Sequence, residues 1–290
     1  MNFHAFRNQI RATLLVFVCA LMAMGGTAHA LVLGLQDGNS TVSIDVDSQH
    51  GLFDWTTDGV NLAPVVGGGN TDYRQWFWYR VGNTPEASID TLARGLTGTS
   101  DGNGDGNPDT AIVNYTGGGF TIQVKFSLVG EPIGSGTSSI GEQIRVQNTT
   151  ASPLDFHFFQ LGDFQLAPPV PGNEVVSFVN NNTVLETGAS GDMQETVHTP
   201  VASHQEAEPW PVTINELNDG APTILADNAG AGPGDITWAY QWDVSIAPGD
   251  SFLISKEMQA AVIIPEPGTW SLVAVAGALA GFVARRKRAS

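Results

Sequence analysis

Oxygen-bearing side chains alternate with glycine in the run Asp101-Gly102-Asn103-Gly104-Asp105-Gly106-Asn107-Pro108-Asp109. Carboxylate and carbonyl oxygens are the ligands that Ca²⁺ takes in proteins, and an EF-hand-type loop makes its sharp turn at a glycine in the sixth place, which Gly106 occupies here. The spacing therefore predicts a calcium loop. Its expected ligands are the side chains of Asp101, Asn103 and Asp105, the backbone carbonyl of Asn107, and Asp109 directly or through water.

The same loop departs from an EF-hand at the twelfth position, where Ile112 replaces the bidentate glutamate. It resembles the short aspartate-rich calcium loops of dockerin and thrombospondin-type repeats. We expect weak binding, as in extracellular modules, that orders the loop and takes no part in catalysis. The alternative is an Asp/Asn/Gly turn between two strands that binds no ion tightly.

A second polar cluster holds two histidines and three glutamates. Its members are Glu195, His198, His204, Glu206 and Glu208. The six-residue spacing of the histidines matches no zinc-hydrolase motif such as H-E-x-x-H, so the cluster is interpreted as a solvated polar loop. Elsewhere, His157 lies in an apolar strand and is expected to be packed or hydrogen-bonded, and His50 is expected in a turn.

No pattern in the sequence supports catalysis. The one serine after residue 30 that fits G-x-S-x-G is Ser100, in Gly98-Thr99-Ser100-Asp101-Gly102, and it leads into the Asp/Asn/Gly loop rather than a helix, so it is no nucleophile elbow; there is no phosphate-binding loop. Glycoside hydrolysis needs two carboxylates facing each other across a cleft, but the many acidic residues of this chain allow any pair to be chosen. We therefore predict a protein that is not an enzyme, with no catalytic residue and no certain cofactor.

Aromatic side chains crowd the run from Tyr73 to Tyr79, which contains Trp76, Phe77 and Trp78. In a strand, Trp76 and Trp78 face one side while Phe77 and Tyr79 face the other, so at least one pair must lie in a core. A pair that reaches solvent could stack on sugar rings. That is the alternative of a carbohydrate-binding module.

Short apolar runs bounded by Gly, Pro, Asn and Asp are typical of all-β proteins, and no segment within residues 31–264 shows a sustained helical period. The predicted strands are Thr41–Val46, Gln75–Val81, Thr110–Tyr115, Phe120–Val129, Glu142–Asn148, Leu154–Leu166, Glu174–Phe178, Asp235–Ile246 and Ser251–Ile264. Alternate residues from Phe120 to Leu128 are apolar and should face one way. We expect a mainly β fold, an antiparallel β-sandwich of the jelly-roll or Ig-like kind, in one domain of residues 31–264.

Turn residues mark the connections between these strands. Gly117-Gly118-Gly119 and Ala247-Pro248-Gly249-Asp250 are predicted to be hairpin turns. Residues 130–141 and 201–234 are rich in Gly, Pro, Ser and Asn and are predicted to be long loops.

The first 30 residues are typical of a secretory signal peptide. Arg7 and Arg11 supply the positive region, residues 12–24 the apolar region, and Ala28-His29-Ala30 the small-x-small cleavage pattern. Signal peptidase would then leave a chain that begins near Leu31. Cys19 is the single cysteine and would be lost with the signal, which excludes disulfides and thiolate chemistry in the exported protein.

The C-terminal residues 265–290 combine three parts in a fixed order. First, Pro265-Glu266-Pro267 is held extended by its prolines. An uncharged span then runs from Gly268 to Ala284, and its length is at the lower limit for a transmembrane helix. A basic cluster follows and is expected on the cytoplasmic side. The cluster consists of Arg285, Arg286, Lys287 and Arg288.

At these residues the chain resembles the PEP-CTERM family of exported bacterial proteins. The resemblance implies recognition by an exosortase in the inner membrane, removal of the anchor near the Pro-Glu-Pro triplet, and a link to exopolysaccharide. The protein would be transiently anchored in the inner membrane and then reach the cell surface or the extracellular space. Residues 141–149 and 154–160 also resemble the bodies of uncharacterised PEP-CTERM proteins, for which no activity follows.

Acidic residues dominate the segment 31–264, which carries six basic and 28 acidic residues and a net charge of −22. Such a surface repels nucleic acid and suits an extracellular matrix. The sequence thus favours a non-enzymatic surface or matrix protein associated with exopolysaccharide. The alternatives are a carbohydrate-binding module, with or without calcium, and a secreted hydrolase.

Overall fold

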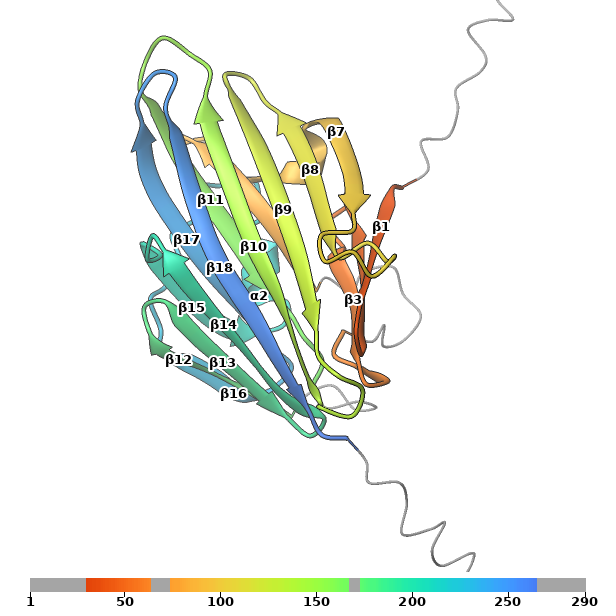
Figure 1. Ribbon diagram of the computed structural model, residues 1–290. Coiled ribbons are helices and arrows are strands. Elements are labelled where there is room, and N and C mark those ends of the chain that lie inside the picture. Colours follow the sequence, from red (N-terminus) through yellow and green to blue (C-terminus); the bar gives the residue numbers. More distant parts are fainter. Residues whose placement is uncertain (1–29, 64–73, 167–172, 265–290) are drawn as a thin grey trace, which may run out of the picture. The chain divides into compact units, whose positions relative to one another are not determined.

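Two β-sheets pack face to face in the part of the chain that the computed structural model describes, residues 30–63, 74–166 and 173–264 (Figure 1). Within these residues each sheet has nine strands, and neighbouring strands are antiparallel except for β3 and β5. The prediction of a mainly β, antiparallel sandwich is confirmed. Each sheet alone has at least as many strands as a whole immunoglobulin or jelly-roll domain.

Sheet A has the strand order β1-β2-β3-β5-β11-β17-β15, with β4 paired to β3 and β6 to β5. Its strands are β1 (Val32–Asp37), β2 (Ser40–Asp45), β3 (Gly51–Thr57), β4 (Val60–Asn61), β5 (Gln75–Val81), β6 (Ala87–Ser88), β11 (Leu154–Gly162), β15 (His204–Pro209) and β17 (Ile236–Ile246).

Sheet B has the order β16-β12-β13-β14-β18-β10-β9-β8-β7. Its strands are β7 (Ala93–Ser100), β8 (Thr110–Thr116), β9 (Phe120–Gly130), β10 (Thr137–Asn148), β12 (Glu174–Asn180), β13 (Thr183–Gly188), β14 (Gly191–Thr199), β16 (Gly230–Gly234) and β18 (Ser251–Val262). The long central strands β9, β10 and β18 run side by side across the front of Figure 1.

The apolar core lies between the two sheets and follows the predicted alternation. On β9 every second residue from Phe120 to Leu128 is buried. From sheet A, Phe77 stacks on Phe158 with ring centroids 5.5 Å apart and reaches Phe126 of sheet B at 6.3 Å. Because each fully buried large apolar side chain contributes about 1.5–3 kcal/mol, these rings hold the sheets together.

The outer face of sheet A is also covered. The 3-10 helix η1 (Ile89–Thr91) and residues 210–229, which include α2 (Val212–Glu216), lie against it. Trp76 therefore donates from Nε1 to Asp90 at 2.9 Å and Trp78 to Asn218 at 3.4 Å, and both indoles are buried. Since Trp76, Phe77 and Trp78 all have 1% exposure or less, none of these three rings offers an open face for stacking on sugars.

One predicted hairpin turn is confirmed and the other is wrong. Residues 117–119 join β8 to β9 within sheet B. The turn at residues 247–250 exists, with Asp250 N–H donating to the Ala247 carbonyl at 3.1 Å, but it connects β17 of sheet A to β18 of sheet B. The chain therefore changes sheets there. Turn residues set the local bend but not which strand the next segment pairs with.

The predicted long loops contain regular structure. Residues 130–141 include the start of β10, and residues 201–234 include β15, α2 and β16. The predicted signal peptide (except Ala30) and the sorting signal at 265–290 lie outside the described residues. None of the helices that the structure describes is both long and apolar enough to cross a membrane.

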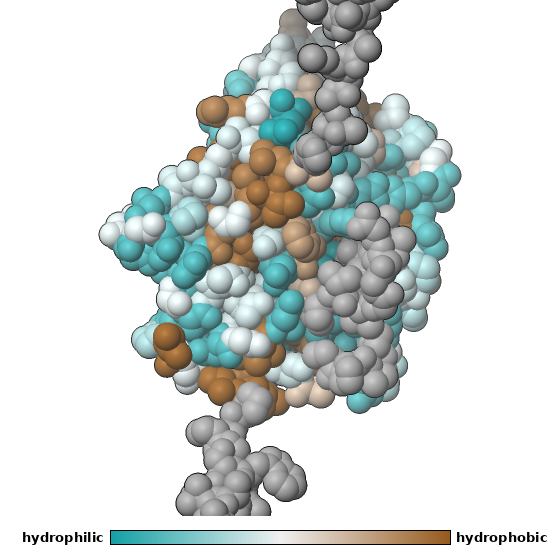
Figure 2. Space-filling view, turned by 90° about the vertical axis from the view of Figure 1, so that its right-hand side faces the viewer, coloured by the Kyte–Doolittle hydropathy of each residue, from teal (hydrophilic) through white to brown (hydrophobic). Residues whose placement is uncertain are grey.

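The side that carries the edge strands β1 and β7 faces the viewer in Figure 2, where apolar patches are broken up by hydrophilic residues. Exposed apolar side chains on these two strands include Val32 at 47% and Leu96 at 83%. Interruption of apolar surface on edge strands limits pairing with other chains.

Candidate functional site

The predicted calcium loop, residues 101–109, is folded onto its own backbone. Asp101 accepts hydrogen bonds from the N–H groups of Gly104 and Gly106 at 2.6 and 2.8 Å, and Asp109 from Gly102 and Asn103, both at 3.0 Å. Burial raises the pKa of Asp109, but hydrogen bonds from Gly102, Thr110 and Asn103 more than offset it and hold the pKa below its ordinary value. Across the described residues no three or more His, Cys, Asp or Glu side chains are arranged to hold a metal ion. Calcium binding stays a prediction.

The histidine and glutamate cluster is not a solvated loop, and that interpretation is wrong. Glu195 and His198 lie on β14, and the other three residues lie on β15. Glu195 and Glu206 are buried, with exposures of 0% and 2%. The strands went unrecognised because charged residues occupy buried positions where an alternating strand normally places apolar ones.

Glu195 belongs to a charged triad between the sheets. The Lys256 ammonium group of β18 contacts Glu142 of β10, and it lies 3.2 Å from Glu195 Oε2. Two amides of sheet A complete the network: Gln75 donates to Glu142 at 3.2 Å, and Gln160 donates to Glu195 at 2.7 Å. All three charged side chains have no exposure, so burial raises the pKa of both glutamates, and that of Glu195 to about 7. The triad tethers the two sheets but is closed to any ligand.

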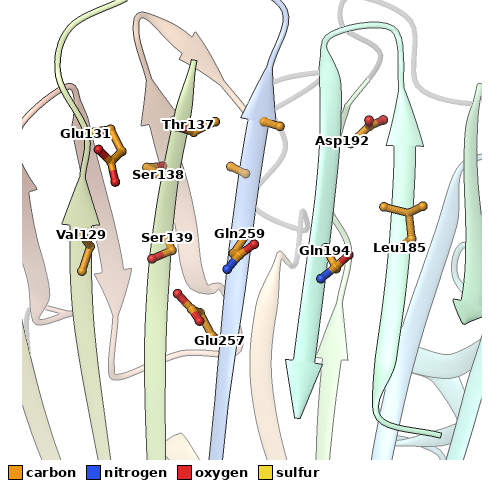
Figure 3. Close-up of a pocket in the computed structure, with 12 residues that line it drawn as sticks. Val129, Glu131, Thr137, Ser138, Ser139, Leu185, Asp192, Gln194, Glu257 and Gln259 are labelled. Atoms are coloured by element: carbon orange, nitrogen blue, oxygen red, sulfur yellow. The ribbon is translucent and has the colours of Figure 1, made fainter. Parts of the chain in front are cut away.

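An open groove lies on the opposite, outer face of sheet B. It consists of two adjoining hollows with volumes of about 590 and 240 Å³. Figure 3 shows the larger one, with Ser139 of β10, Glu257 and Gln259 of β18, and Gln194 of β14 along its floor. Volumes of this size suit a small polar ligand. Polar side chains stand here because alternate residues of β10, β14 and β18 face outward.

The two hollows meet at Glu257, which lines both. Beside it, Gly141 stands directly opposite in the register of β10 and β18. The nearest atom to an added Cβ at Gly141 would be the Ser127 carbonyl oxygen at 3.9 Å, an ordinary contact. The missing side chain of Gly141 therefore deepens the groove next to the Glu257 carboxylate.

An acid–base pair stands in this groove. His198 Nε2 lies 3.7 Å from Glu257 Oε2, and their side chains are 52% and 34% exposed. Carboxylate and imidazole are the groups that proteins use most to accept and donate protons near neutral pH. Both groups are reachable from solvent, and hydroxyl and amide side chains surround them, namely Ser139, Gln143, Gln194, Ser255 and Gln259.

A second array of histidines and aspartates lies on the outer face of sheet A. Asp243 is placed between His157, at 2.5 Å from Nδ1, and His204, at 3.4 Å from Nε2. Burial raises the pKa of Asp243, but hydrogen bonds from Gln241 and His157 outweigh this effect and lower it overall. His157 is thus hydrogen-bonded, as predicted. The carboxylate holds both imidazoles in place, and neither hollow of the groove is near them.

Solved structures with a similar fold include two candidate aldose 1-epimerases and a glucoamylase. The structure is similar to a candidate aldose 1-epimerase from Escherichia coli K12, with a TM-score of 0.53, 11% identity, and coverage of 81% of this chain and 100% of that one. A candidate aldose 1-epimerase from Klebsiella pneumoniae matches with a TM-score of 0.50 and 9% identity over 80% of each chain. A bacterial glucoamylase solved with acarbose also scores 0.50, at 10% identity, over 83% of this chain and 34% of its own.

No protein-family model and no curated protein matches the sequence. The likeness is therefore one of fold. The sequence predicted a structural surface or matrix protein and no enzymatic activity. Both predictions are contradicted, because the solved structures with this fold include carbohydrate-processing enzymes. Both expectations depended on missing motifs, whereas a site on a β-sandwich gathers single residues from several strands that no short motif records.

Sequence reasoning singled out only one residue of the groove, His198, and placed it in a loop. Glu257 and Gln259 carried a usable signal, because they alternate with the buried Ile254, Lys256 and Met258 of β18. Strand β18 was predicted, so its outward polar positions could have been named. The position of these residues beside β14 could not have been predicted, because β14 itself was missed.

Proposed function

We propose that this protein acts on a saccharide held in the groove of sheet B, and that Glu257 and His198 interconvert the two anomers of a reducing sugar. The observation that carries the proposal is the contact of this acid–base pair inside an open, hydroxyl- and amide-lined groove. The fold shared with candidate aldose 1-epimerases and with a glucoamylase supports a carbohydrate as the substrate.

The chemistry requires one base and one acid beside the same carbon. The base takes the proton of the anomeric hydroxyl while the acid protonates the ring oxygen, and the bond between the anomeric carbon and the ring oxygen breaks. Rotation of the resulting aldehyde and closure on its other face, with both proton transfers reversed, gives the other anomer. Both reacting oxygens are attached to one carbon, so an acid and a base in contact with each other can reach them together.

A polarimetric assay tests the proposal with freshly dissolved α-D-glucose and α-D-galactose. The protein is expected to accelerate the approach to anomeric equilibrium for at least one of them. Glu257→Gln and His198→Ala should each lower kcat/KM by about 10²–10⁴-fold, the usual contribution of a general acid or base. Asp250→Asn, an exposed carboxylate in the turn between the sheets, serves as the matched control.

A variant that fills the groove with an apolar side chain tests whether the substrate binds there, without removing the proposed acid or base. Gly141→Leu removes no functional group, and the open space beside Gly141 admits the side chain, so loss of activity in this variant would locate the substrate in the groove. Rates unchanged by all three groove variants, or no acceleration by the native protein, would refute the proposal. Sugar binding without acceleration would leave a carbohydrate-binding module.

We also propose that the chain is exported and sorted. The residues at both ends support this, since a signal peptide and the Pro265-Glu266-Pro267 motif with its basic cluster flank the sandwich. The resemblance to PEP-CTERM proteins would bring the groove into contact with extracellular polysaccharide, whose released reducing sugars are substrates of the proposed reaction.

A further inference from the structure

Residues 218–226, here called the strap, cross the outer face of sheet A after helix α2. Most of the strap is exposed, including all of Asn218–Pro222, and Leu225 is its one buried residue. Gly220 adopts a φ of +80°, which suits a turn that stands away from the sheet. The strap is thus a thin cover that is anchored by little apolar surface.

Polar side chains from the face beneath attach the strap. Arg80 donates to the Thr223 carbonyl at 2.9 Å, and Glu86 accepts from the Thr223 N–H at 2.9 Å. Gln241 accepts from the Leu225 N–H at 3.0 Å, and Glu206 from the Ala226 N–H at 2.8 Å. With Trp78, which donates to Asn218 at 3.4 Å, these five side chains form the covered face: Trp78, Arg80, Glu86, Glu206 and Gln241.

Like charges oppose this closed arrangement. Burial raises the pKa of Glu216, just before the strap, and the neighbouring Glu206 and Glu208 raise it further. Burial also raises the pKa of Glu86, above the offset from Thr223 and Arg80, and Asp219 of the strap adds to the increase. Carboxylates on the strap side therefore face carboxylates on the sheet side, so hydrogen bonds rather than charge hold the strap in place.

We propose that the strap is releasable and that its release uncovers a second saccharide-binding face, formed by Trp78, Arg80, Glu206 and Gln241 together with Glu86. The strap supplies each of these side chains with a partner, mostly a backbone N–H or C=O group. Sugar hydroxyls donate and accept in the same way, so an incoming saccharide can replace these bonds one for one.

The covered face also offers an apolar component. The Arg80 guanidinium lies 5.7 Å from the centre of the Phe159 ring, and the indole of Trp78 lies on the same side of sheet A. Aromatic faces next to hydrogen-bonding groups suit the mixed surface of a sugar ring. This site is on the opposite sheet from the groove and is independent of the proposed reaction there.

A covalent crosslink between the strap and the turn before β3 tests the proposal in the full chain. Gln49 and Asn218 exchange two amide hydrogen bonds of 3.1 and 3.3 Å, which marks them as a close pair between the strap and the turn before β3. Cysteines are introduced as Gln49→Cys and Asn218→Cys, with Cys19→Ser to remove the native cysteine and Gly141→Leu to block the groove. A short bis-maleimide then ties the strap down, and N-ethylmaleimide on the same variant is the matched control.

Hydrogen exchange of residues 218–226 is measured with and without maltotetraose or cellotetraose. In the N-ethylmaleimide control we expect at least one sugar to accelerate exchange of the Thr223, Leu225 and Ala226 amides by tenfold or more, while the amides of β9 and β10 stay unchanged. The crosslinked protein should show no such response. The proposal is overturned if neither sugar changes exchange in the control, or if the response persists after crosslinking.

Discussion

Replacing Glu195 with glutamine should change how the stability of the protein depends on pH. Glu142, Glu195 and Lys256 are fully buried together, and with both glutamates ionised the triad carries one uncompensated negative charge. One proton shared between the two carboxyls removes that charge. Burial raises the pKa of Glu195 from its ordinary 4.5 to about 7, with Lys256 lowering it and Glu142 raising it in part.

The sign and the size follow from this shift. Because the folded state binds the proton more tightly than the unfolded state, the stabilisation is fully present below pH 4.5 and is lost as the pH rises through 7. Each tenfold difference in proton affinity corresponds to 1.36 kcal/mol, so the loss between these limits is about 3 kcal/mol. Glutamine at position 195 keeps the side-chain volume and an acceptor for Lys256 but cannot ionise.

Urea unfolding followed by tryptophan fluorescence, at steps from pH 4 to pH 8, measures this effect. The free energy of unfolding of Glu195→Gln, relative to the native protein, should rise by about 3 kcal/mol from pH 4 to pH 8. Glu142→Gln should behave alike, since the proton is shared. Asp250→Asn, which changes an exposed carboxylate in the turn between the sheets, is the control and should show no such trend.

A relative free energy of unfolding that is constant from pH 4 to pH 8 would refute the argument. It would mean that the folded and unfolded states hold the proton of Glu195 equally well. Taking the difference between variants is essential, because Asp58, Asp109 and Asp243 have lowered pKa values and shift the total stability in the opposite direction.

Three further predictions concern the rest of the chain. Lys256→Met should destabilise the fold by about 3–5 kcal/mol at neutral pH, because it leaves buried carboxylates uncompensated, and by less at pH 4.5; urea unfolding at both pH values checks this. If residues 101–109 bind Ca²⁺, millimolar Ca²⁺ should raise the Tm and Asp101→Asn with Asp105→Asn should abolish the rise, whereas equal Tm values with Ca²⁺ and with chelator would exclude the site. Immunoblots should show a smaller, membrane-released protein only in cells with the exosortase, and Pro265→Ala with Pro267→Ala should prevent the change; equal mass in both strains would contradict processing.

The regular part of the fold was predictable because its apolar residues follow the period of a strand. Strand β5 matches the predicted range, and β9 and β17 match within one residue at each end. Strands β13, β14 and β15 were missed, since Glu186, Glu195 and Glu206 occupy buried positions that the pattern expects to be apolar. Each of these glutamates has a hydrogen-bond or ion-pair partner that is distant in sequence or on another element, namely Trp238, Lys256 and Thr213 in that order, and this partner makes the burial tolerable. Such contacts leave no pattern in the local sequence.

The candidate site was less predictable because its residues become neighbours only through strand register. Glu257 is opposite Gly141 on one side and Thr196 on the other, across two strands that are remote in sequence. Glu257, one acid among 28 in the segment 31–264, has no distinguishing local context.

Register also links the buried triad to the groove. Lys256 and Glu257 are consecutive on β18, so they face opposite sides: the ammonium group meets Glu142 and Glu195 inside, and the carboxylate meets His198 outside. A slip of one residue against β10 or β14 would place Glu257 among buried carboxylates and Lys256 in solvent. Such a slip puts like charges together without compensation, which costs several kcal/mol. The triad therefore favours one register, and that register is what holds Glu257 and His198 in contact.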